Sequence, residues 1–188
     1  MHLNIPNILT LSRLGFIPVI MVFFFLPYEW ARPAAAWLYG LAAITDWFDG
    51  YLARKLNQQS ALGAFLDPVA DKLIVAVALI LIASEVGDYH WLVIVGTCVI
   101  IGREITISAL REWMATLGKR STVAVSMMGK VKTGVQMLAI GFLLHKLPFY
   151  GINTRDIGVV LLIIAAILTV VSMLIYLKAA YNEMRNHA

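Results

Sequence analysis

The sequence has few charged residues and a single cysteine, and each shortage excludes a class of protein or of site. Of its 188 residues, 14% are charged and 61% are hydrophobic, whereas soluble domains have about 25% charged and about 45–50% apolar residues. An ordinary soluble domain is therefore excluded, and the composition predicts an integral membrane protein. The single cysteine, Cys98, excludes an intrachain disulfide and a cysteine-based metal site. Because Cys98 lies in an apolar run, we expect it to pack in the core.

Histidine and polar tracts are also scarce. The four histidines, His2, His90, His145 and His187, have no metal-ligand spacing, so we expect them at solvated or interfacial positions. The sequence has no repeat, no low-complexity tract and no separate soluble domain. A net charge of +4 would suit a nucleic-acid partner, but the basic residues gather at one predicted membrane face. Anionic lipid headgroups are the natural partner there, so we expect no nucleic-acid partner.

Long apolar segments fill most of the chain. Six are long enough to cross a hydrocarbon core, which is about 30 Å thick and needs about 20 apolar helical residues. They cover approximately residues 8–28, 34–56, 62–84, 91–114, 124–146 and 157–180. Turn-forming residues such as Pro27, Pro33 and Gly118 separate them. The sequence therefore predicts an all-α polytopic membrane protein, a bundle of six transmembrane helices that forms one domain over residues 1–188.

The distribution of basic residues predicts the orientation, because lysine and arginine concentrate in short cytoplasmic loops. If both termini are inside, only Arg32, Lys146 and Arg155 lie on the outer side. Twelve lie on the inner side: Arg13, Arg54, Lys55, Lys72, Arg103, Arg111, Lys119, Arg120, Lys130, Lys132, Lys178 and Arg185. We therefore expect both termini in the cytoplasm.

Four aspartates inside the second and third predicted spans are the most informative residues: Asp46, Asp49, Asp67 and Asp71. Carboxylates at membrane depth are costly and mark functional sites. Spacings of three and four place each pair on one face of its helix, and the predicted topology brings both faces together near the cytoplasmic side. Divalent cations that arrive with a phosphate-bearing substrate would offset the repulsion, and oxygen ligands favour magnesium or manganese.

Small residues accompany the acids. Gly50 and Ala53 share the face of Asp46 and Asp49, and Gly63 precedes Asp67 by four residues. Such residues let a nucleotide or a neighbouring backbone approach closely, and close helix packing is the alternative interpretation of the same pattern.

The acids and small residues belong to a longer pattern. The order Asp46-x-x-Asp49-Gly50-x-x-Ala53-Arg54-x8-Gly63-x3-Asp67-x3-Asp71 resembles the signature of the CDP-alcohol phosphotransferase family at every position. Eight fixed residues across 26 positions make this signal specific. The stretches from Asn4 to Arg13, Gly102 to Glu104 and Arg111 to Trp113 extend the resemblance to nearly the whole chain.

The resemblance implies transfer of the phosphatidyl group of CDP-diacylglycerol to glycerol 3-phosphate, which gives phosphatidylglycerophosphate and CMP. It implies that the four aspartates hold two divalent cations, Mg2+ or Mn2+, on the donor diphosphate, and that Asp71 is also the general base. The residues that it places around the cytidine diphosphate are Asn7, Thr10, Arg13, Gly50, Ala53, Arg54 and Gly63. It also implies a homodimer in the bacterial cytoplasmic membrane, with the active site on the cytoplasmic side.

An acceptor that carries its own phosphate needs a second cationic subsite. Arg103 and Arg111 are the first candidates, because they are eight residues apart on the fourth predicted span and arginine grips phosphate through two oxygens. Lys130 is the next candidate. The alternatives are that Arg103 pairs with Glu104 or a distant acid, and that the nearby basic residues Lys119, Arg120 and Lys132 only follow the inward-positive rule.

Two other functions fit parts of the pattern. The same transferase chemistry could use another acceptor, such as serine, an inositol phosphate or a second lipid, because the signature specifies only the CDP donor. Intramembrane acids also mark ion pathways, so a divalent-cation transporter is a more distant alternative. The placement of all four acids near the inner boundary argues against a transporter, since a pathway would need acids further across.

Overall fold

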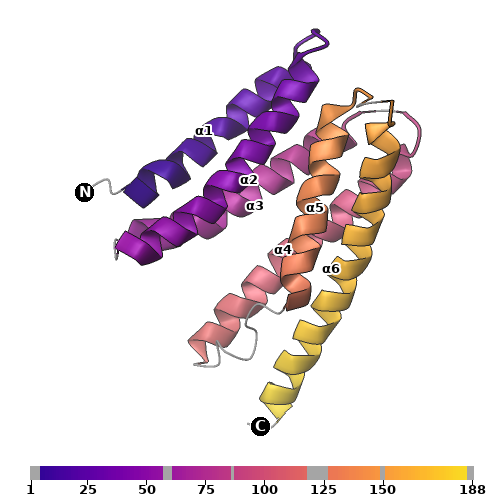
Figure 1. The fold of residues 1–188 in the computed structure, drawn as a ribbon. Coiled ribbons are helices and arrows are strands. Elements are labelled where there is room, and N and C mark those ends of the chain that lie inside the picture. Colours follow the sequence, from indigo (N-terminus) through magenta and orange to yellow (C-terminus); the bar gives the residue numbers. More distant parts are fainter. Residues whose placement is uncertain (1–4, 57–60, 86, 118–126, 149–150, 186–188) are drawn as a thin grey trace. The chain divides into compact units, whose positions relative to one another are not determined.

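The computed structural model describes residues 5–56, 61–85, 87–117, 127–148 and 151–185, which form six helices (Figure 1). Side chains of residues 5–9, 46–56, 61–65, 127, 128, 130, 183 and 184 lie outside this description. The helices are α1 (Ile5–Phe25), α2 (Ala31–Leu56), α3 (Ala61–Ala83), α4 (His90–Thr116), α5 (Met127–His145) and α6 (Thr154–Arg185). Each coincides with one predicted segment, so the all-α prediction is confirmed.

The helix boundaries differ from the predicted ones by about three residues at α1, which is shifted toward the N-terminus at both ends, and at the starts of α2 and α6. We expected Pro33 in a turn, yet α2 begins at Ala31 and contains Pro33 in its first turn. Proline fits there because the first amide groups of a helix have no acceptor within it. At the other end of the chain, α6 continues to Arg185, past the apolar stretch that we predicted to end near residue 180.

The chain divides into two compact parts, and the first contains residues 1–86 and 140–158. Within it, α1 packs against both α2 and α3. The connection between α1 and α2 is short, so the two run in opposite directions, and α3 runs parallel to α1 (Figure 1). Most of the interior of this part is apolar: Ile20, Ala31, Ala35, Ala70 and Leu79 are almost completely buried.

An ion cluster in the first part joins α2 to the ends of α3 and α5. Arg32 donates to Glu85 at 2.7 and 3.2 Å and to the carbonyl oxygen of Leu144 at 3.1 Å. The guanidinium of Arg32 also lies 3.9 Å from the ring centre of Phe24. Lys146 donates to the same carboxylate at 2.9 Å. Burial alone would raise the pKa of Glu85, but Lys146 and Arg32 more than offset it, so the pKa lies below its ordinary value.

The second part contains residues 87–139 and 159–188, and therefore α4, most of α5 and most of α6. Ile107, Met114, Tyr176 and Ala180 form an apolar cluster between α4 and α6. Gly96 permits close packing of the same two helices, because a Cβ atom at this position would lie 3.1 Å from the side chain of Leu162.

Cys98 does not pack in the core, contrary to our expectation: it is exposed on α4. The buried stripe of this helix passes through Val93, Gly96, Thr97 and Ile100. Residues between these positions point away from the stripe, because an α-helix turns by about 100° per residue. An apolar run therefore does not tell which of its residues face the interior.

By length and apolar composition, two helical stretches in the described part of the chain could span a membrane: His90–Thr116 and Thr154–Asn182. Two shorter apolar stretches, Thr10–Phe25 and Val131–His145, accompany them.

Candidate functional site

Two residues of α1 contact two of the predicted metal-binding aspartates on α3. The Thr10 hydroxyl donates to Oδ1 of Asp67 at 2.5 Å, and Nη1 of Arg13 forms an ion pair with Oδ1 of Asp71. The spacing of three on α1 and of four on α3 places each pair of residues on one helix face. Because α1 and α3 run parallel, the two contacts follow one another along the interface between these helices. Sequence reasoning placed these four residues near one substrate but did not predict this pairing.

Burial differs sharply between the α1 residues and Asp71 at this interface. Thr10 and Arg13 are each 1% exposed, whereas 45% of the Asp71 side chain remains accessible. The α1 groups are therefore held in the interior, and the Asp71 carboxylate is open to a ligand. Two carboxylates one turn apart supply hard oxygen donors of the kind that Mg2+ and Mn2+ prefer.

The other two acids, Asp46 and Asp49, lie in α2, although their side chains are outside the description. Asp46 is ten residues before the end of α2 at Leu56, and Asp71 is ten residues after the start of α3 at Ala61. Both positions are therefore about 15 Å from the end at which α2 meets the start of α3. Among the described side chains, no group of three or more His, Cys, Asp and Glu residues is close enough to hold a metal ion.

Several other predicted site residues also have side chains outside the description. Their backbones lie in helices: Asn7 in α1; Gly50, Ala53 and Arg54 in α2; Gly63 in α3; Lys130 in α5. Their predicted contacts with the nucleotide and the acceptor phosphate stay predictions.

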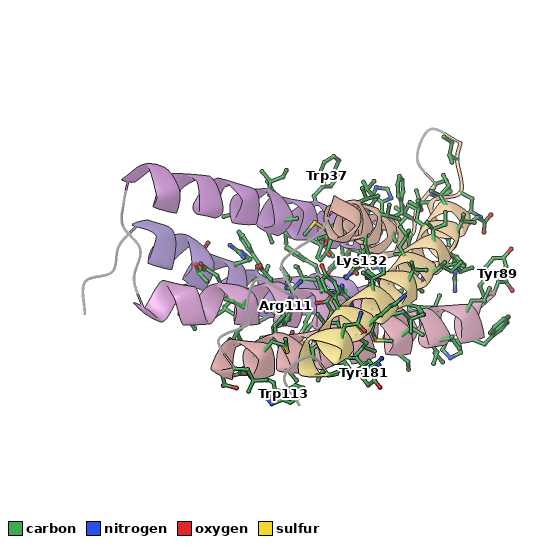
Figure 2. The ribbon with its side chains drawn as sticks, turned by 90° about the horizontal axis from the view of Figure 1, so that it is seen from below. Trp37, Tyr89, Arg111, Trp113, Lys132 and Tyr181 are labelled. Carbon is green, nitrogen blue, oxygen red and sulfur yellow. The ribbon has the colours of Figure 1, made fainter. Side chains whose placement is uncertain are left out.

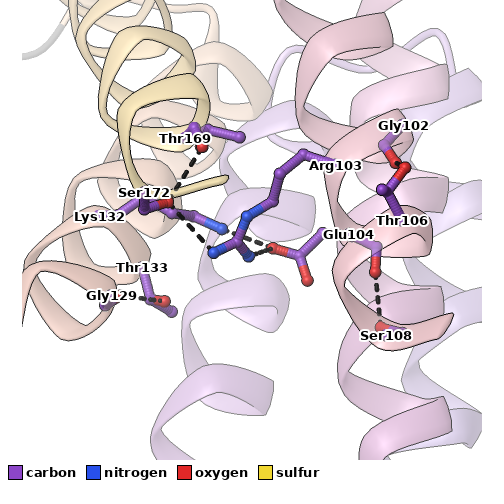
Figure 3. A network of polar contacts seen from close by, with 10 residues as sticks. All are labelled: Gly102, Arg103, Glu104, Thr106, Ser108, Gly129, Lys132, Thr133, Thr169 and Ser172. Atoms are coloured by element: carbon purple, nitrogen blue, oxygen red, sulfur yellow. Dashed lines mark hydrogen bonds and ion pairs between the residues drawn. The ribbon is translucent and has the colours of Figure 1, made fainter. Parts of the chain in front are cut away.

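Arg103 belongs to a buried polar network in the second part (Figure 3). Its Nη1 donates to Oε1 of Glu104 at 3.0 Å, and its Nη2 donates to the Ser172 hydroxyl at 3.2 Å. Nζ of Lys132 donates to the same Glu104 oxygen at 2.5 Å. The network thus ties α4 to α5 and α6. The pairing of Arg103 with Glu104 is the alternative that the sequence left open, and the structure contains it.

Arg111 extends the cationic region along α4. Its guanidinium carbon lies 5.4 Å from the ring centre of Tyr176, and that of Arg103 lies 5.9 Å from the same ring. Two guanidinium groups therefore flank one aromatic ring of α6, an arrangement favoured by cation–π attraction. In Figure 2, Trp113 and Tyr181 project outward, and both side chains are exposed.

Lys132 is a candidate that sequence reasoning undervalued. We grouped it with basic residues that follow the inward-positive rule, yet it is 2% exposed and ion-paired. A usable signal was the helical spacing of Lys132, Gln136, Ala139 and Leu143, all of which are buried. This spacing puts Lys132 on the interior face of α5.

Comparisons with known proteins agree with the signature in the sequence. Residues 3–171 match the CDP-alcohol phosphatidyltransferase family. A relative from Salmonella choleraesuis (strain SC-B67), named CDP-diacylglycerol--glycerol-3-phosphate 3-phosphatidyltransferase, is 52% identical over 185 residues, which cover 98% of each chain. A relative of the same name from Escherichia coli (strain K12) is 51% identical with the same coverage. The chain therefore belongs to the CDP-alcohol phosphatidyltransferase family.

Proposed function

We propose that this enzyme transfers the phosphatidyl group of CDP-diacylglycerol to glycerol 3-phosphate, which yields phosphatidylglycerophosphate and CMP. The observation that carries the proposal is the 52% identity, over 98% of both chains, to a relative named for this donor and acceptor. The two signature residues with described side chains agree with it, because Asp67 and Asp71 both contact α1 and the Asp71 side chain is accessible.

The residues of the first part fit a divalent-metal site. We infer that Asp46, Asp49, Asp67 and Asp71 hold two cations, Mg2+ or Mn2+, because oxygen donors one turn apart on neighbouring helices suit these ions. When bound, such ions supply positive charge to the donor diphosphate and stabilise the leaving phosphate. Gly50, Ala53, Arg54, Gly63 and Asn7 are proposed to surround the cytidine diphosphate, as the family signature implies.

Asp71 is proposed to accept the proton of the primary hydroxyl of the acceptor. Its side chain is 45% exposed and forms an ion pair with the buried Arg13. Arg13 and Thr10 thus hold the carboxylates of Asp71 and Asp67 in fixed directions, as groups outside the reacting set commonly do for metal ligands. We accordingly propose that Thr10 and Arg13 position these carboxylates. Closure of the nucleotide pocket by the same two residues stays a prediction, and the kinetics of Arg13→Met distinguish the two roles.

The acceptor phosphate is proposed to bind the basic residues of the second part. Arg103 and Arg111 flank Tyr176, and Lys132 reaches the network from α5. Arginine and lysine together match the charge and the hydrogen-bond acceptors of a phosphate dianion. Lys130, also on α5, is retained from the sequence-based prediction.

A membrane location with six crossings is proposed from the distribution of polarity. Large apolar residues are exposed on the helices, for example Val22, Ile94, Ile167 and Leu174. Charged and amide side chains such as Arg13, Lys132 and Gln136 are instead buried. This distribution of polar and apolar side chains is the reverse of that in a water-soluble protein, and it suits a hydrocarbon environment. We propose a bacterial cytoplasmic membrane, cytoplasmic termini and active site, and, from the family resemblance, a homodimer.

A product assay tests the proposed function. The purified protein is incubated with CDP-diacylglycerol and labelled glycerol 3-phosphate, with Mg2+ or Mn2+ or with a chelator. We expect labelled lipid and an equal amount of CMP only when the metal is present. Labelled lipid from serine or an inositol phosphate, but none from glycerol 3-phosphate, would exclude the proposed acceptor.

A further inference from the structure

Glu104 is the carboxylate at the centre of the polar network in the second part. Its Oε1 accepts hydrogen bonds from Arg103 on the same helix and from Lys132 on α5, at 3.0 and 2.5 Å (Figure 3). The side chains of Arg103 and Lys132 are 8% and 3% exposed, whereas that of Glu104 is 26% exposed. A single oxygen therefore holds together two buried cations that come from different helices.

Without this carboxylate, the two cations would repel each other in an environment of low polarity. Arg111 adds a third positive charge, since its guanidinium shares the Tyr176 ring with that of Arg103. A shared carboxylate offsets the repulsion and also fixes the directions of the donors that it binds. The hydroxyl of Ser172 anchors the opposite side of Arg103, so that its guanidinium is held from two sides.

The network retains the capacity to bind an anion. Arg103, Arg111 and Lys132 together carry three positive charges against the one negative charge of Glu104. Lysine has three N–H donors and arginine has five, more than Glu104 and Ser172 use. The Nε atoms of Arg103 and Arg111 are buried without a hydrogen-bond partner in the described structure. The excess of charge and of donors matches a phosphate dianion.

We propose that Glu104 is a positioning residue for the acceptor: it holds Arg103 and Lys132 at the separation and orientation in which their remaining donors converge on one phosphate. This role rests on the proposed function, which assigns the acceptor phosphate to these cations. Glu104 itself does not contact the phosphate, because two anions would repel, and it acts through its two cationic partners.

Steady-state kinetics of Glu104→Gln in the full-length protein test the proposal. We expect the half-saturating concentration of glycerol 3-phosphate to rise about tenfold or more, while kcat and the half-saturating CDP-diacylglycerol concentration change by less than about threefold. Glu29→Gln is the matched control, because Glu29 is exposed between α1 and α2, and it should leave all three values unchanged. Glu104→Asp keeps the charge and should give an intermediate acceptor dependence.

A double-mutant cycle separates positioning from a general structural effect. Because Glu104 acts partly through Lys132, Glu104→Gln should weaken acceptor use by a smaller factor in Lys132→Met than in the wild type. Fully multiplicative effects would overturn the proposal, and so would a lower half-saturating acceptor concentration in Glu104→Gln, which would mean that Glu104 competes with the phosphate. If Glu104→Gln cannot be purified in folded form, unchanged acceptor dependence in Glu104→Asp also overturns it.

The same assay distinguishes this role from the proposed function. A wild-type protein that releases no CMP with glycerol 3-phosphate contradicts the proposed function itself. Normal wild-type turnover, together with unchanged acceptor dependence in Glu104→Gln, contradicts only the positioning role.

Discussion

Replacing Arg13 by methionine should slow turnover without weakening donor binding. The substitution keeps an unbranched apolar stem in α1 and removes the guanidinium that pairs with Asp71. A hydrogen bond to a charged group contributes about 1.5–3 kcal/mol, and each 1.36 kcal/mol is a tenfold change in rate. The Asp71 side chain is 45% exposed, so water can partly replace the lost group. We therefore expect kcat to fall about 10-fold to 100-fold, with the smaller loss favoured.

The assay measures CMP release while each substrate is varied in turn at saturating metal. A positioning role predicts that the half-saturating CDP-diacylglycerol concentration changes by less than about threefold, whereas a nucleotide-binding role predicts that it rises. Arg13→Lys keeps the charge but not the planar donor group, and it should recover part of kcat. An unchanged kcat, combined with a donor concentration raised tenfold or more, would refute the positioning role of Arg13.

Three further predictions concern the stability of the first part, measured by thermal unfolding in detergent. Arg32→Met should lower Tm by about 4–8 °C, because it removes roughly 2 kcal/mol from a buried pair. Lys146→Met should lower Tm by no more than about 2 °C, because the Lys146 side chain is 46% exposed. Equal shifts would contradict this ranking. The lowered pKa of Glu85 means that its stabilisation is present above the ordinary value of 4.5 and is lost as pH falls through the lower folded value. Glu85→Gln should therefore reduce the loss of Tm on acidification, and an unchanged acid slope would exclude this cause. Gly158→Ala should destabilise by about 1–3 kcal/mol, because a Cβ atom would lie 2.6 Å from Cγ of Leu143, and its effect should be less than additive with Leu143→Ala; strict additivity would show that this contact is not the cause.

Periodicity in the sequence was sufficient to predict the helices and the shared face of Asp67 and Asp71. Apolar runs of about 20 residues encode the helices, and a spacing of four places Asp67 and Asp71 on one side of α3. The pairing of Thr10 with Asp67 could not be predicted in this way. It depends on how α1 and α3 slide along each other, and residues 57 positions apart carry no periodic signal for that register.

The polar network of the second part shows the same limit. The sequence offered Glu104 or an unspecified distant acid as the partner of Arg103. The structure also joins Arg103 to Ser172 across 69 residues, and Lys132 to Glu104 across 28. The burial of Lys132 results from the rotation of α5 about its axis, which packing decides. Cys98 was misplaced for a related reason, because hydropathy alone does not distinguish an apolar-run residue exposed on the surface from one that faces the core.

The central claim is that the aspartates of α2 and α3 carry out the transfer, and the rate of phosphatidylglycerophosphate formation by Asp71→Asn tests it most directly. At saturating Mg2+ or Mn2+ and both substrates, we expect the rate to fall at least about 10³-fold, while Tm stays close to that of the wild type and part of the CDP-diacylglycerol binding persists. A folded Asp71→Asn protein that forms the lipid at a rate within about tenfold of the wild type would contradict the account.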